Sequence, residues 1–363
     1  MKKNKNYVDL KDQPVPEGQH LLEVDDLKMY FHTEDGVVRA VDGVSYTLDR
    51  GETLGVVGES GSGKSVTAMT IMGLISMPPG KIEGGDVRYR GRSILEMTEE
   101  EMQHIRGNDI AMIFQDPMTS LNPVYKIGKQ VGEGLRLHRG YSKQEALKRA
   151  TELLDLVGIP EPEKRVNEYP HQFSGGMRQR VMIAMALACD PDILIADEPT
   201  TALDVTIQAQ IIELMQEMQE KNGNAIIMIT HDLGVVADMA DKIMVMYAGR
   251  PVEFGTAEEI FYESRHPYTW GLIRSIPEQA IEEKKPLTPI HGNPPSLMNL
   301  PKGCVFSPRC PYATDKCRKQ RPERVVTESG HYSACHYSGD PEFLKNAPET
   351  SRTRKDSKKG GEA

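Results

Sequence analysis

Hydrophobic and polar positions alternate in two different ways along this chain, and each way predicts a kind of structure. From Leu21 to Leu54, short apolar stretches such as LLEVDDLKMYF are separated by the turn sequences EDG and DRGE, which favours antiparallel strands. The later runs TLGVVG, DILIADE, NAIIMITHD and DKIMVMYAG are almost wholly apolar, and helical segments separate them. Such an alternation is typical of a mostly parallel sheet. We therefore expect an α/β fold with an antiparallel β-rich part near its N-terminus.

Helical periodicity and turn-forming residues suggest how the chain is divided. The segment from about residue 116 to 180 contains long helical patterns such as SKQEALKRATELLDLVGI, which predict a helical subdomain inserted into a domain that spans residues 21–284. Proline and glycine become dense from Lys284 to Gly303, so we expect a C-terminal extension over residues 285–340. The polar ends, 1–20 and 341–363, are expected to be mobile or disordered tails.

Composition predicts a cytosolic protein without a membrane span. The longest apolar run, VMIAMALAC, has about half the length that a helix needs to cross a bilayer. No apolar stretch follows the N-terminal lysines, as a secretory signal would require. The formal net charge is −9 and there is no strongly basic block, so nucleic acid is not an expected partner. At a membrane, the protein would have to bind to another protein.

One glycine-rich sequence predicts a phosphate-binding loop. Its residues are Gly58, Glu59, Ser60, Gly61, Ser62, Gly63, Lys64 and Ser65. They fit the pattern G-x-x-x-x-G-K-[ST] and stand between a predicted strand and a predicted helix. Val66, the next residue in that helix, is also expected to contact the nucleotide. Glycines let backbone N–H groups surround an anion, and the helix N-terminus adds a favourable dipole. The lysine can reach the β- and γ-phosphates, and the last serine can bind Mg²⁺.

Polar residues at the ends of the other apolar runs complete a candidate nucleotide site. Asp197 and Glu198 end ILIADE, where we expect the first to join the Mg²⁺ shell and the second to activate a water as general base. His231 follows the apolar run in MITHD. Gln115 follows the one in MIFQDP, and its amide could contact both Mg²⁺ and the water. Taken alone, a single histidine is more often an ordinary hydrogen-bonded residue, and Gln115 is equally compatible with a structural role.

Five motifs in a fixed order point to a family. GESGSGKS, IFQDP, FSGGMRQR, ILIADEPTTALD and ITHD together resemble the ATP-binding subunit of ABC transporters over roughly residues 21–260. The resemblance implies ATP and Mg²⁺ as cofactors, and a P-loop core with an antiparallel β-subdomain and a helical subdomain. It also implies that two cassettes meet head to tail, so that Ser174, Gly175 and Gly176 of one chain bind the nucleotide held by Lys64 of the other.

The same resemblance implies roles for further residues. Gln115 lies in a loop that contacts metal and water, Asp204 in a loop that crosses the dimer, and His231 in the switch that contacts the γ-phosphate. An aromatic residue near the N-terminus stacks on adenine in such proteins. Counting back along LKMYF places that role on Phe31, with Tyr30 as the alternative.

The C-terminal sequence narrows the resemblance to one subfamily. HPYTWGLIRSIP and GNPPSLMNLPKGCVFSPRCPYATDKC resemble the extension of peptide-importer ATPases, so the likeness covers about residues 21–340. It implies a peripheral subunit at the cytoplasmic face of the cell membrane. Its partners would be a second, related ATP-binding subunit, two integral membrane permease subunits and an extracytoplasmic solute-binding protein. Met177 departs from the family pattern, where most members carry glutamine, but its backbone can still donate and we expect hydrolysis to be retained.

Other functions remain open on the sequence alone. We expect an ATPase that powers import of oligopeptides or dipeptides, and the alternative is the same role in a nickel or other small-solute importer. ABC-type ATPases that act on DNA or ribosomes usually have a long coiled coil or two cassettes, whereas here one stretch, 66–173, separates Ser65 from Ser174. A protein that only binds nucleotide is disfavoured because all the catalytic candidates are present.

Four of the five cysteines are gathered near the C-terminus: Cys304, Cys310, Cys317 and Cys335. A reducing cytosol disfavours disulfides, and proline and charged residues between the thiols do not resemble a core-forming sequence. The spacing lacks the C-x₂-C pairs usual for zinc, although four thiolates suit zinc as well. The stretch resembles dipeptide-importer ATPases, some of which carry a [4Fe–4S] cluster, so we expect one cluster here with zinc as the alternative. We expect Cys189 to lie inside the apolar helix after FSGG and to stay a buried free thiol.

Overall fold

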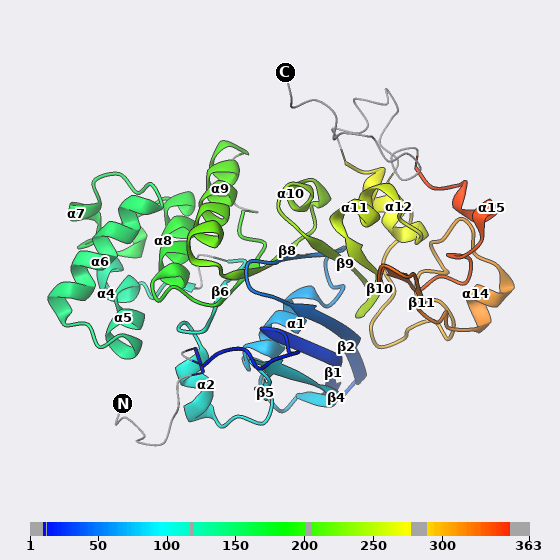
Figure 1. Ribbon diagram of the computed structural model, residues 1–363, viewed down its shortest axis with the longest axis horizontal. Coiled ribbons are helices and arrows are strands. Elements are labelled where there is room, and N and C mark those ends of the chain that lie inside the picture. The colour runs from blue at the N-terminus through cyan, green and yellow to red at the C-terminus, as the bar shows by residue number, and fades with distance from the viewer. Residues whose placement is uncertain (1–9, 12, 117–119, 201–204, 277–288, 349–363) are drawn as a thin grey trace.

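The computed structural model describes two sheets with helices packed around them (Figure 1). The described residues are 10–11, 13–116, 120–200, 205–276 and 289–348. In Figure 1 the antiparallel sheet lies below the larger sheet, the inserted helices lie on the left, and the C-terminal extension lies on the right. This arrangement confirms the predicted α/β fold with an additional antiparallel sheet near the N-terminus.

The N-terminal part forms a four-stranded antiparallel sheet in the order β2-β1-β4-β5. Its strands are β1 (Leu22–Thr33), β2 (Gly36–Leu48), β4 (Gly80–Tyr89) and β5 (Arg92–Ser93). Leu22, Val24, Leu27 and Met29 of β1 are buried, and the residues between them are exposed or half-buried. One face of this sheet therefore packs on the core, as the alternation of apolar and polar residues predicts.

The larger sheet has eight strands in the order β11-β12-β10-β9-β3-β8-β7-β6. Five neighbouring strands run parallel: β9 (Lys242–Tyr247), β3 (Thr53–Val57), β8 (Ala225–Thr230), β7 (Ile193–Asp197) and β6 (Ile110–Ile113). Almost every position in them is buried, because helices and the other sheet cover both faces. The antiparallel strands are β10 (Arg250–Thr256), β11 (Val325–Val326) and β12 (Tyr332–Ser333).

The helical subdomain has its own apolar core beside β6 and β7. Its helices are α4 (Ile127–Val131), α5 (Glu133–His138), α6 (Lys143–Leu156), α7 (Pro162–Arg165), the 3₁₀ turn η1 (Pro170–Gln172) and α8 (Gly175–Leu187). Ser142 and Glu145 form a capping box that starts α6. Ala150, Leu153 and Leu154 of that helix are buried in the subdomain core.

The remaining helices pack on the two sheets or belong to the C-terminal part. They are α1 (Lys64–Ile71), α2 (Glu99–Ile105), α9 (Val205–Asn222), α10 (Leu233–Ala237), α11 (Ala257–Tyr262), α12 (Pro267–Ile273), α14 (Asp315–Lys319) and α15 (Pro341–Leu344). None of the helices in the described ranges combines the length and apolar character needed to cross a membrane.

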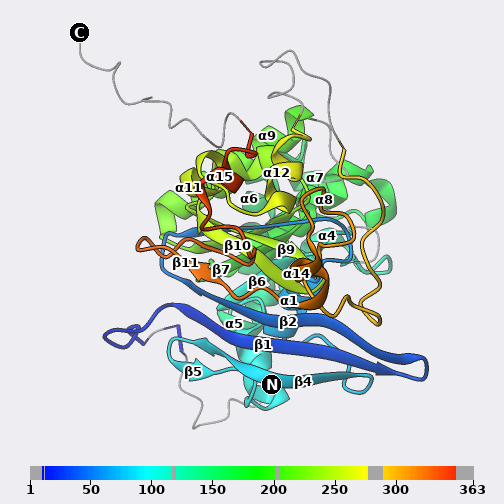
Figure 2. The same cartoon turned by 90° about the vertical axis from the view of Figure 1, so that its right-hand side faces the viewer.

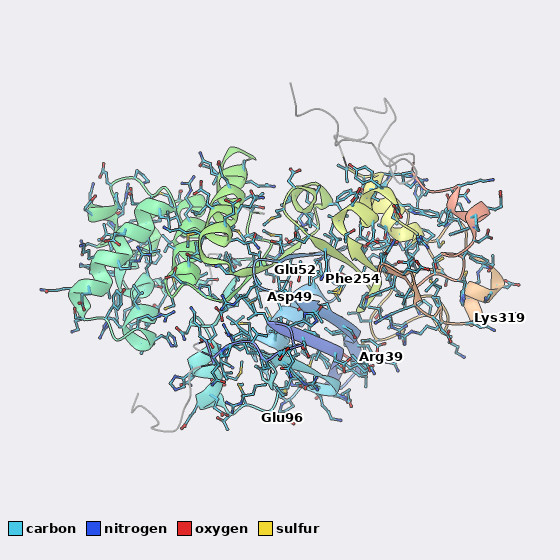
Figure 3. All side chains as sticks on the ribbon, in the orientation of Figure 1. Arg39, Asp49, Glu52, Glu96, Phe254 and Lys319 are labelled. Atoms are coloured by element: carbon cyan, nitrogen blue, oxygen red, sulfur yellow. The ribbon has the colours of Figure 1, made fainter. Side chains whose placement is uncertain are left out.

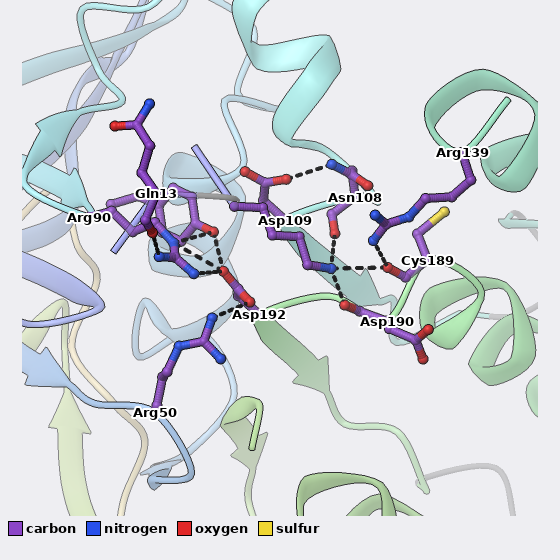
Figure 4. A network of polar contacts seen from close by, with 11 residues as sticks. Gln13, Arg50, Arg90, Asn108, Asp109, Arg139, Cys189, Asp190 and Asp192 are labelled. Atoms are coloured by element: carbon purple, nitrogen blue, oxygen red, sulfur yellow. Dashed lines mark hydrogen bonds and ion pairs between the residues drawn. The ribbon is translucent and has the colours of Figure 1, made fainter. Parts of the chain in front are cut away.

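A buried polar network joins the two sheets at the side where β7 begins (Figure 4). Asp192 is 5% exposed and accepts hydrogen bonds from Tyr89 at 2.6 Å and from Arg50 at 2.8 Å, and Arg90 forms an ion pair with it. The Arg90 side chain is 3% exposed. Because both charges of this ion pair are buried, removing Arg90 would leave Asp192 with only the exposed Arg50 as an ionic partner.

Part of the predicted N-terminal tail packs on this network. Residues 1–9 and 12 lie outside the described residues, but Leu10 is 4% exposed in the core. The Lys11 ammonium donates to the backbone carbonyls of Asn108, Cys189 and Asp190. We expected a mobile tail up to residue 20, but the burial of Leu10 holds this short segment against the body of the protein.

The C-terminal extension continues the larger sheet and covers one end of it, which faces the viewer in Figure 2. Strand β12 pairs with β10, and the Tyr332 ring stacks on Phe254, which Figure 3 labels next to the extension. His331 and Glu253 form a buried pair at 3.1 Å. Lys319, at the end of α14, marks the outer edge of the molecule in Figure 3.

The packed part of the chain extends beyond the predicted boundary at residue 340. Phe343 of α15 contacts Trp270, with ring centroids 5.3 Å apart, and Tyr312, at 5.6 Å. Trp270 is fully buried. The aromatic contacts of a single phenylalanine therefore hold residues 341–344 in a helix, although the expected tail began at 341, and residues 349–363 lie outside the described part.

Candidate nucleotide-binding and catalytic site

Four neighbouring parallel strands end at the candidate site. β3 leads into Gly58, β8 into His231, and β7 ends at Asp197, while β6 ends two residues before Gln115. These strands are adjacent in the order β3-β8-β7-β6. Because the carboxyl ends of parallel strands meet at one edge of the sheet, four segments that are distant in sequence are placed side by side there.

The phosphate-binding loop, residues 58–65, needs glycine at two positions. Gly63 has φ of 101°, and a Cβ there would lie 2.3 Å from the carbonyl oxygen of Ala40. A Cβ on Gly58 would lie 2.2 Å from the carbonyl oxygen of Met246. Backbone from β2 and β9 thus encloses the loop so closely that a side chain at either position would displace it.

Lys64 is buried inside this loop at the start of α1. Its ammonium donates to the carbonyl oxygens of Gly58 at 2.6 Å and Glu59 at 3.0 Å, and the residue is 5% exposed. Burial lowers the pKa of Lys64, whereas the nearby charges of Glu198, Asp197 and Glu59 oppose this shift. The ammonium is thus held by weak neutral acceptors, which a phosphate could replace.

The loop fits a phosphate group in three respects. The first N–H groups of α1 have no partner within their helix, the Lys64 cation lies at the same helix end, and the Ser62 hydroxyl is buried without a hydrogen-bond partner among the described residues. These donors all suit an anion.

Ser65 and Asp197 form a pair of oxygen ligands beside the loop. The Ser65 hydroxyl donates to Asp197 Oδ1 at 3.0 Å, and Asp197 is 2% exposed. Burial raises the pKa of Asp197, and the hydrogen bond from Ser65 opposes that shift. A hydroxyl and a carboxylate at this spacing are the oxygen ligands that Mg²⁺ prefers, and a cation would also compensate the buried charge.

Glu198 is held by two of the other predicted residues. Gln115 Nε2 donates to Glu198 Oε2 at 2.9 Å, and His231 Nδ1 lies 3.3 Å from Glu198 Oε1. The backbone N–H of Glu198 bonds to the Ile229 carbonyl at 2.8 Å, while its φ of 48° is unusual for a residue with a side chain. Gln115 and His231, predicted at separate strand ends, thus both contact the Glu198 carboxylate, which is 12% exposed.

The predicted signature residues lie elsewhere, at the N-terminus of α8. Ser174 caps this helix by accepting from the Met177 N–H at 3.3 Å. Ser174 and Gly175 are exposed, and Gly176 is half-buried. Within the described part of the chain, no hydrogen bond or ion pair joins these residues to the phosphate-binding loop. Asp204 lies outside the described residues.

The two aromatic candidates for adenine differ in their contacts. The Tyr30 hydroxyl donates to Asp42 Oδ1 at 2.9 Å, and the Arg39 guanidinium lies 5.9 Å from the centre of the Tyr30 ring. Burial and the bond to Asp42 raise the pKa of Tyr30 to about 12. Phe31 is half-buried near the end of β1, opposite Val38. Tyr30 is thus committed to neighbours within the sheet.

Glu59 of the phosphate-binding loop has partners that the sequence did not reveal. Its carboxylate forms two bonds with Arg309, at 2.5 and 2.9 Å, and its N–H donates to the Tyr268 hydroxyl at 2.9 Å. These residues are 250 and 209 positions away. A negative side chain inside an anion-binding loop was the one available indication that a cation would be found beside it.

The four clustered cysteines line one small pocket, together with Phe306 and Tyr337 among others. Backbone N–H groups are directed at three of the sulfurs, and burial raises the pKa of Cys304, of Cys310 to about 11 and of Cys335 to about 12. All are free thiols. Within the described residues, no three histidine, cysteine or acidic side chains are grouped closely enough to hold a metal ion.

Cys189 is a buried free thiol, as expected, but it follows the end of α8 and is not inside the helix. Its carbonyl oxygen accepts from Arg139 at 2.6 Å. The helix ends there because the following sequence, DPD, turns the chain towards β7.

Comparison with known proteins agrees with this geometry. Residues 41–201 match the family described as ABC transporter, and residues 252–317 match the family described as oligopeptide/dipeptide transporter, C-terminal region. The oligopeptide transport ATP-binding protein OppD of Bacillus subtilis is 58% identical over 312 residues, covering 86% of this chain and 87% of that protein. The dipeptide transport ATP-binding protein DppD of Escherichia coli is 52% identical over 320 residues, covering 88% and 97%.

Solved structures also resemble the fold. The ATP-binding cassette MJ0796, in a dimeric post-hydrolysis state bound to ADP and Pi, is 29% identical with a TM-score of 0.60. The similarity covers 65% of this chain and 98% of that one. The strand ends, the phosphate-binding loop and both family matches lead to one conclusion. This chain belongs to the ABC transporter family, in its group of oligopeptide and dipeptide transport ATP-binding proteins.

Proposed function

We propose that this chain hydrolyses ATP to power the import of oligopeptides or dipeptides through a membrane transporter. The observation that carries the proposal is the Glu198 carboxylate, held by Gln115 and His231 at the same sheet edge as the phosphate-binding loop. Two relatives support peptides as the transported solute: they are named as oligopeptide and dipeptide transport proteins and are 58% and 52% identical to this chain.

The chain's own residues divide the hydrolytic work. Lys64 exchanges its two carbonyl acceptors for phosphate oxygens, and the N-terminus of α1, with Val66 in its first turn, faces the same anion. Ser65, Asp197 and Gln115 are the proposed Mg²⁺ ligands, and the ion would neutralise phosphate charge when bound. Glu198 accepts a proton from a water whose oxygen attacks the γ-phosphorus, and ADP leaves. His231 and Gln115 orient the Glu198 carboxylate for this step.

The adenine and the second half of the site come from different places. We assign adenine stacking to Phe31, since Tyr30 is bonded to Asp42. Ser174, Gly175 and Gly176 are available at an exposed helix N-terminus, which suits an anion held by another chain. The partner cassette is proposed to be a related but different subunit, with Asp204 in the loop that crosses between them. The dimeric MJ0796 cassette supports a paired arrangement.

The membrane subunits would bind beside Gln115. Gln130 holds the neighbouring loop, because its side chain accepts from the Asn122 N–H at 2.8 Å and donates to the Tyr125 carbonyl at 2.9 Å. Val124, at 71% exposure, and Tyr125, at 44%, leave apolar surface on this loop. We propose that a short cytoplasmic helix of a permease subunit packs there, which places the chain at the cytoplasmic face of the membrane as a peripheral subunit. The solute-binding protein would join through the permeases.

The cysteine pocket is proposed to bind a [4Fe–4S] cluster, with zinc as the alternative. Four thiols line it, and N–H groups directed at sulfur suit thiolate ligands. In the described residues the four sulfurs are not close enough together to hold a metal, so they would have to move closer when the cluster binds. Anaerobically purified protein should be brown and contain iron and sulfide, and stoichiometric zinc without iron in such material would contradict the cluster.

Uptake by a reconstituted transporter tests the main proposal. The chain, its partner cassette and the permease subunits are placed in vesicles with the binding protein outside, and uptake of labelled dipeptides, tetrapeptides and a nickel chelate is followed. ATP-dependent uptake of peptides is expected. Uptake of only the nickel chelate would instead support the small-solute alternative, and uptake without ATP would contradict the role of this chain.

A further inference from the structure

The phosphate-binding loop is held from outside by one arginine of the C-terminal extension. Arg309 forms a two-pronged pair with Glu59, the second residue of the loop, with N–O distances of 2.5 and 2.9 Å. The Arg309 side chain is only 4% exposed, and Glu59 is 29% exposed. A planar guanidinium that meets a carboxylate in this way fixes both its position and its orientation.

Arg309 is itself held firmly, so it can act as a fixed support. Its Nε donates to the His291 carbonyl at 2.9 Å, one terminal nitrogen to the Ile290 carbonyl at 3.2 Å, and the other to the Tyr247 hydroxyl at 3.4 Å. The backbone N–H of Arg309 bonds to the Phe306 carbonyl at 3.0 Å, which closes a tight turn. The pKa of the guanidinium is raised, chiefly by the bonds to Glu59.

The loop is held through its main chain as well. The Glu59 N–H donates to Tyr268, whose ring is fully buried against Tyr247 and Phe306, with centroids 4.6 and 5.3 Å away. Arg309 and Tyr268 both lie within residues 252–317, which match the C-terminal transporter family and are separate from the 41–201 match. The C-terminal part therefore contributes to the back of the nucleotide site.

The charge of Glu59 matters to the lysine of the loop. Lys64 donates to the Glu59 carbonyl at 3.0 Å, and the Glu59 carboxylate is among the charges that act on the Lys64 ammonium. An unpaired carboxylate here would attract that ammonium away from phosphate and would repel the phosphate itself. Pairing with Arg309 weakens both effects, because the guanidinium compensates the carboxylate charge within one ion pair.

We propose that Arg309 is a positioning residue for ATP binding. It neutralises Glu59 and fixes the start of the phosphate-binding loop. The inference rests on the proposed nucleotide site. It assigns to the C-terminal part a direct role in ATP affinity.

The test measures MgATP binding to the full-length chain by calorimetry, in the wild type, Arg309→Met, Glu59→Gln and the double variant. Arg309→Met should raise Kd about tenfold, because it leaves a released carboxylate beside the phosphates. The double variant should return to within about threefold of Glu59→Gln, since the unpaired charge is gone. This rescue separates a charge effect from a structural one, which would not be restored by removing the acid.

Matched variants keep the result interpretable. Arg318→Met removes an exposed arginine of the same extension, paired with Asp315 at 3.2 Å, and should leave Kd unchanged. Arg309→Lys keeps the charge and loses the second prong, so an intermediate Kd is expected even if Arg309→Met does not fold.

The possible failures differ from one another. Wild-type affinity in both Arg309 variants, or a weakened Arg309→Met that Glu59→Gln does not rescue, would overturn the role of Arg309 alone. A wild-type chain that does not bind MgATP would overturn the nucleotide site, and this proposal with it.

Discussion

Gln115 Nε2 and Glu198 Oε2 are 2.9 Å apart, although 83 positions separate the two residues along the chain. The bond places the end of β6 against the end of β7, so that the loop proposed to contact the permease also holds the proposed catalytic base. Movement of that loop would release or reorient the carboxylate, so the proposed permease contact would act directly on the proposed catalytic base.

Glu198→Gln should slow ATP hydrolysis by about 100-fold or more while MgATP still binds, because the change removes only the base. Steady-state phosphate release by the assembled transporter measures the rate, and calorimetry measures binding. Glu213→Gln, on α9, is a matched control and should hydrolyse at the wild-type rate. Full activity of Glu198→Gln would show that another group accepts the proton.

Lys64→Ala should weaken MgATP binding by about tenfold or more, since it removes the buried cation of the phosphate-binding loop. Lys81→Ala provides the comparison, because Lys81 is 63% exposed and pairs with Glu83 in the antiparallel sheet. Its Kd should match the wild type. If the two variants bound equally well, the loop would not be the phosphate site.

The isolated chain should hydrolyse ATP slowly and gain activity with its partner cassette and permeases, because Ser174 and Gly176 are proposed to act on the other chain's nucleotide. Ser174→Arg should leave MgATP binding by the isolated chain within about twofold of wild type. In the assembled complex the same change should abolish most of the stimulation. A monomer at full rate without partners would contradict the shared site.

Arg90→Met should lower the free energy of unfolding by about 3 kcal/mol, because it removes the buried partner of Asp192 and leaves only the exposed Arg50 paired with that buried carboxylate. Chemical denaturation of the isolated chain gives the value. MgATP affinity should be retained in the folded protein, as the network lies at the amino end of β7 and the proposed nucleotide site lies at its carboxyl end. Arg88→Met, with a 43% exposed side chain, should cost less than about 1 kcal/mol.

Local patterns predicted the parts of the site that are continuous in sequence. The phosphate-binding loop and the strand ends at Asp197 and His231 could be found because apolar runs of strand length precede them. These inferences need only the geometry of one sheet edge. The contact between Gln115 and Glu198 was not predicted, and only the structure shows it.

The pairing of Arg309 with Glu59 could not be predicted in the same way. It depends on how the extension folds back after the region around residue 285, and no periodicity records that path. The burial of Leu10 and the packing of Phe343 are similar cases, since a single apolar side chain decided each. Ser174 is different again, because its proposed ligand belongs to another chain.

The turn from Cys304 to Cys310 touches two sites at once: its ends line the cysteine pocket, and Arg309 within it holds Glu59. Thermodynamic linkage makes such sharing reciprocal. If Arg309 sets ATP affinity as proposed, a ligand at the cysteines that alters the free energy of this turn would alter ATP affinity, and ATP would alter the affinity of that ligand by the same factor. Nucleotide binding and ligand binding at the cysteines would thus be coupled through one short segment of backbone.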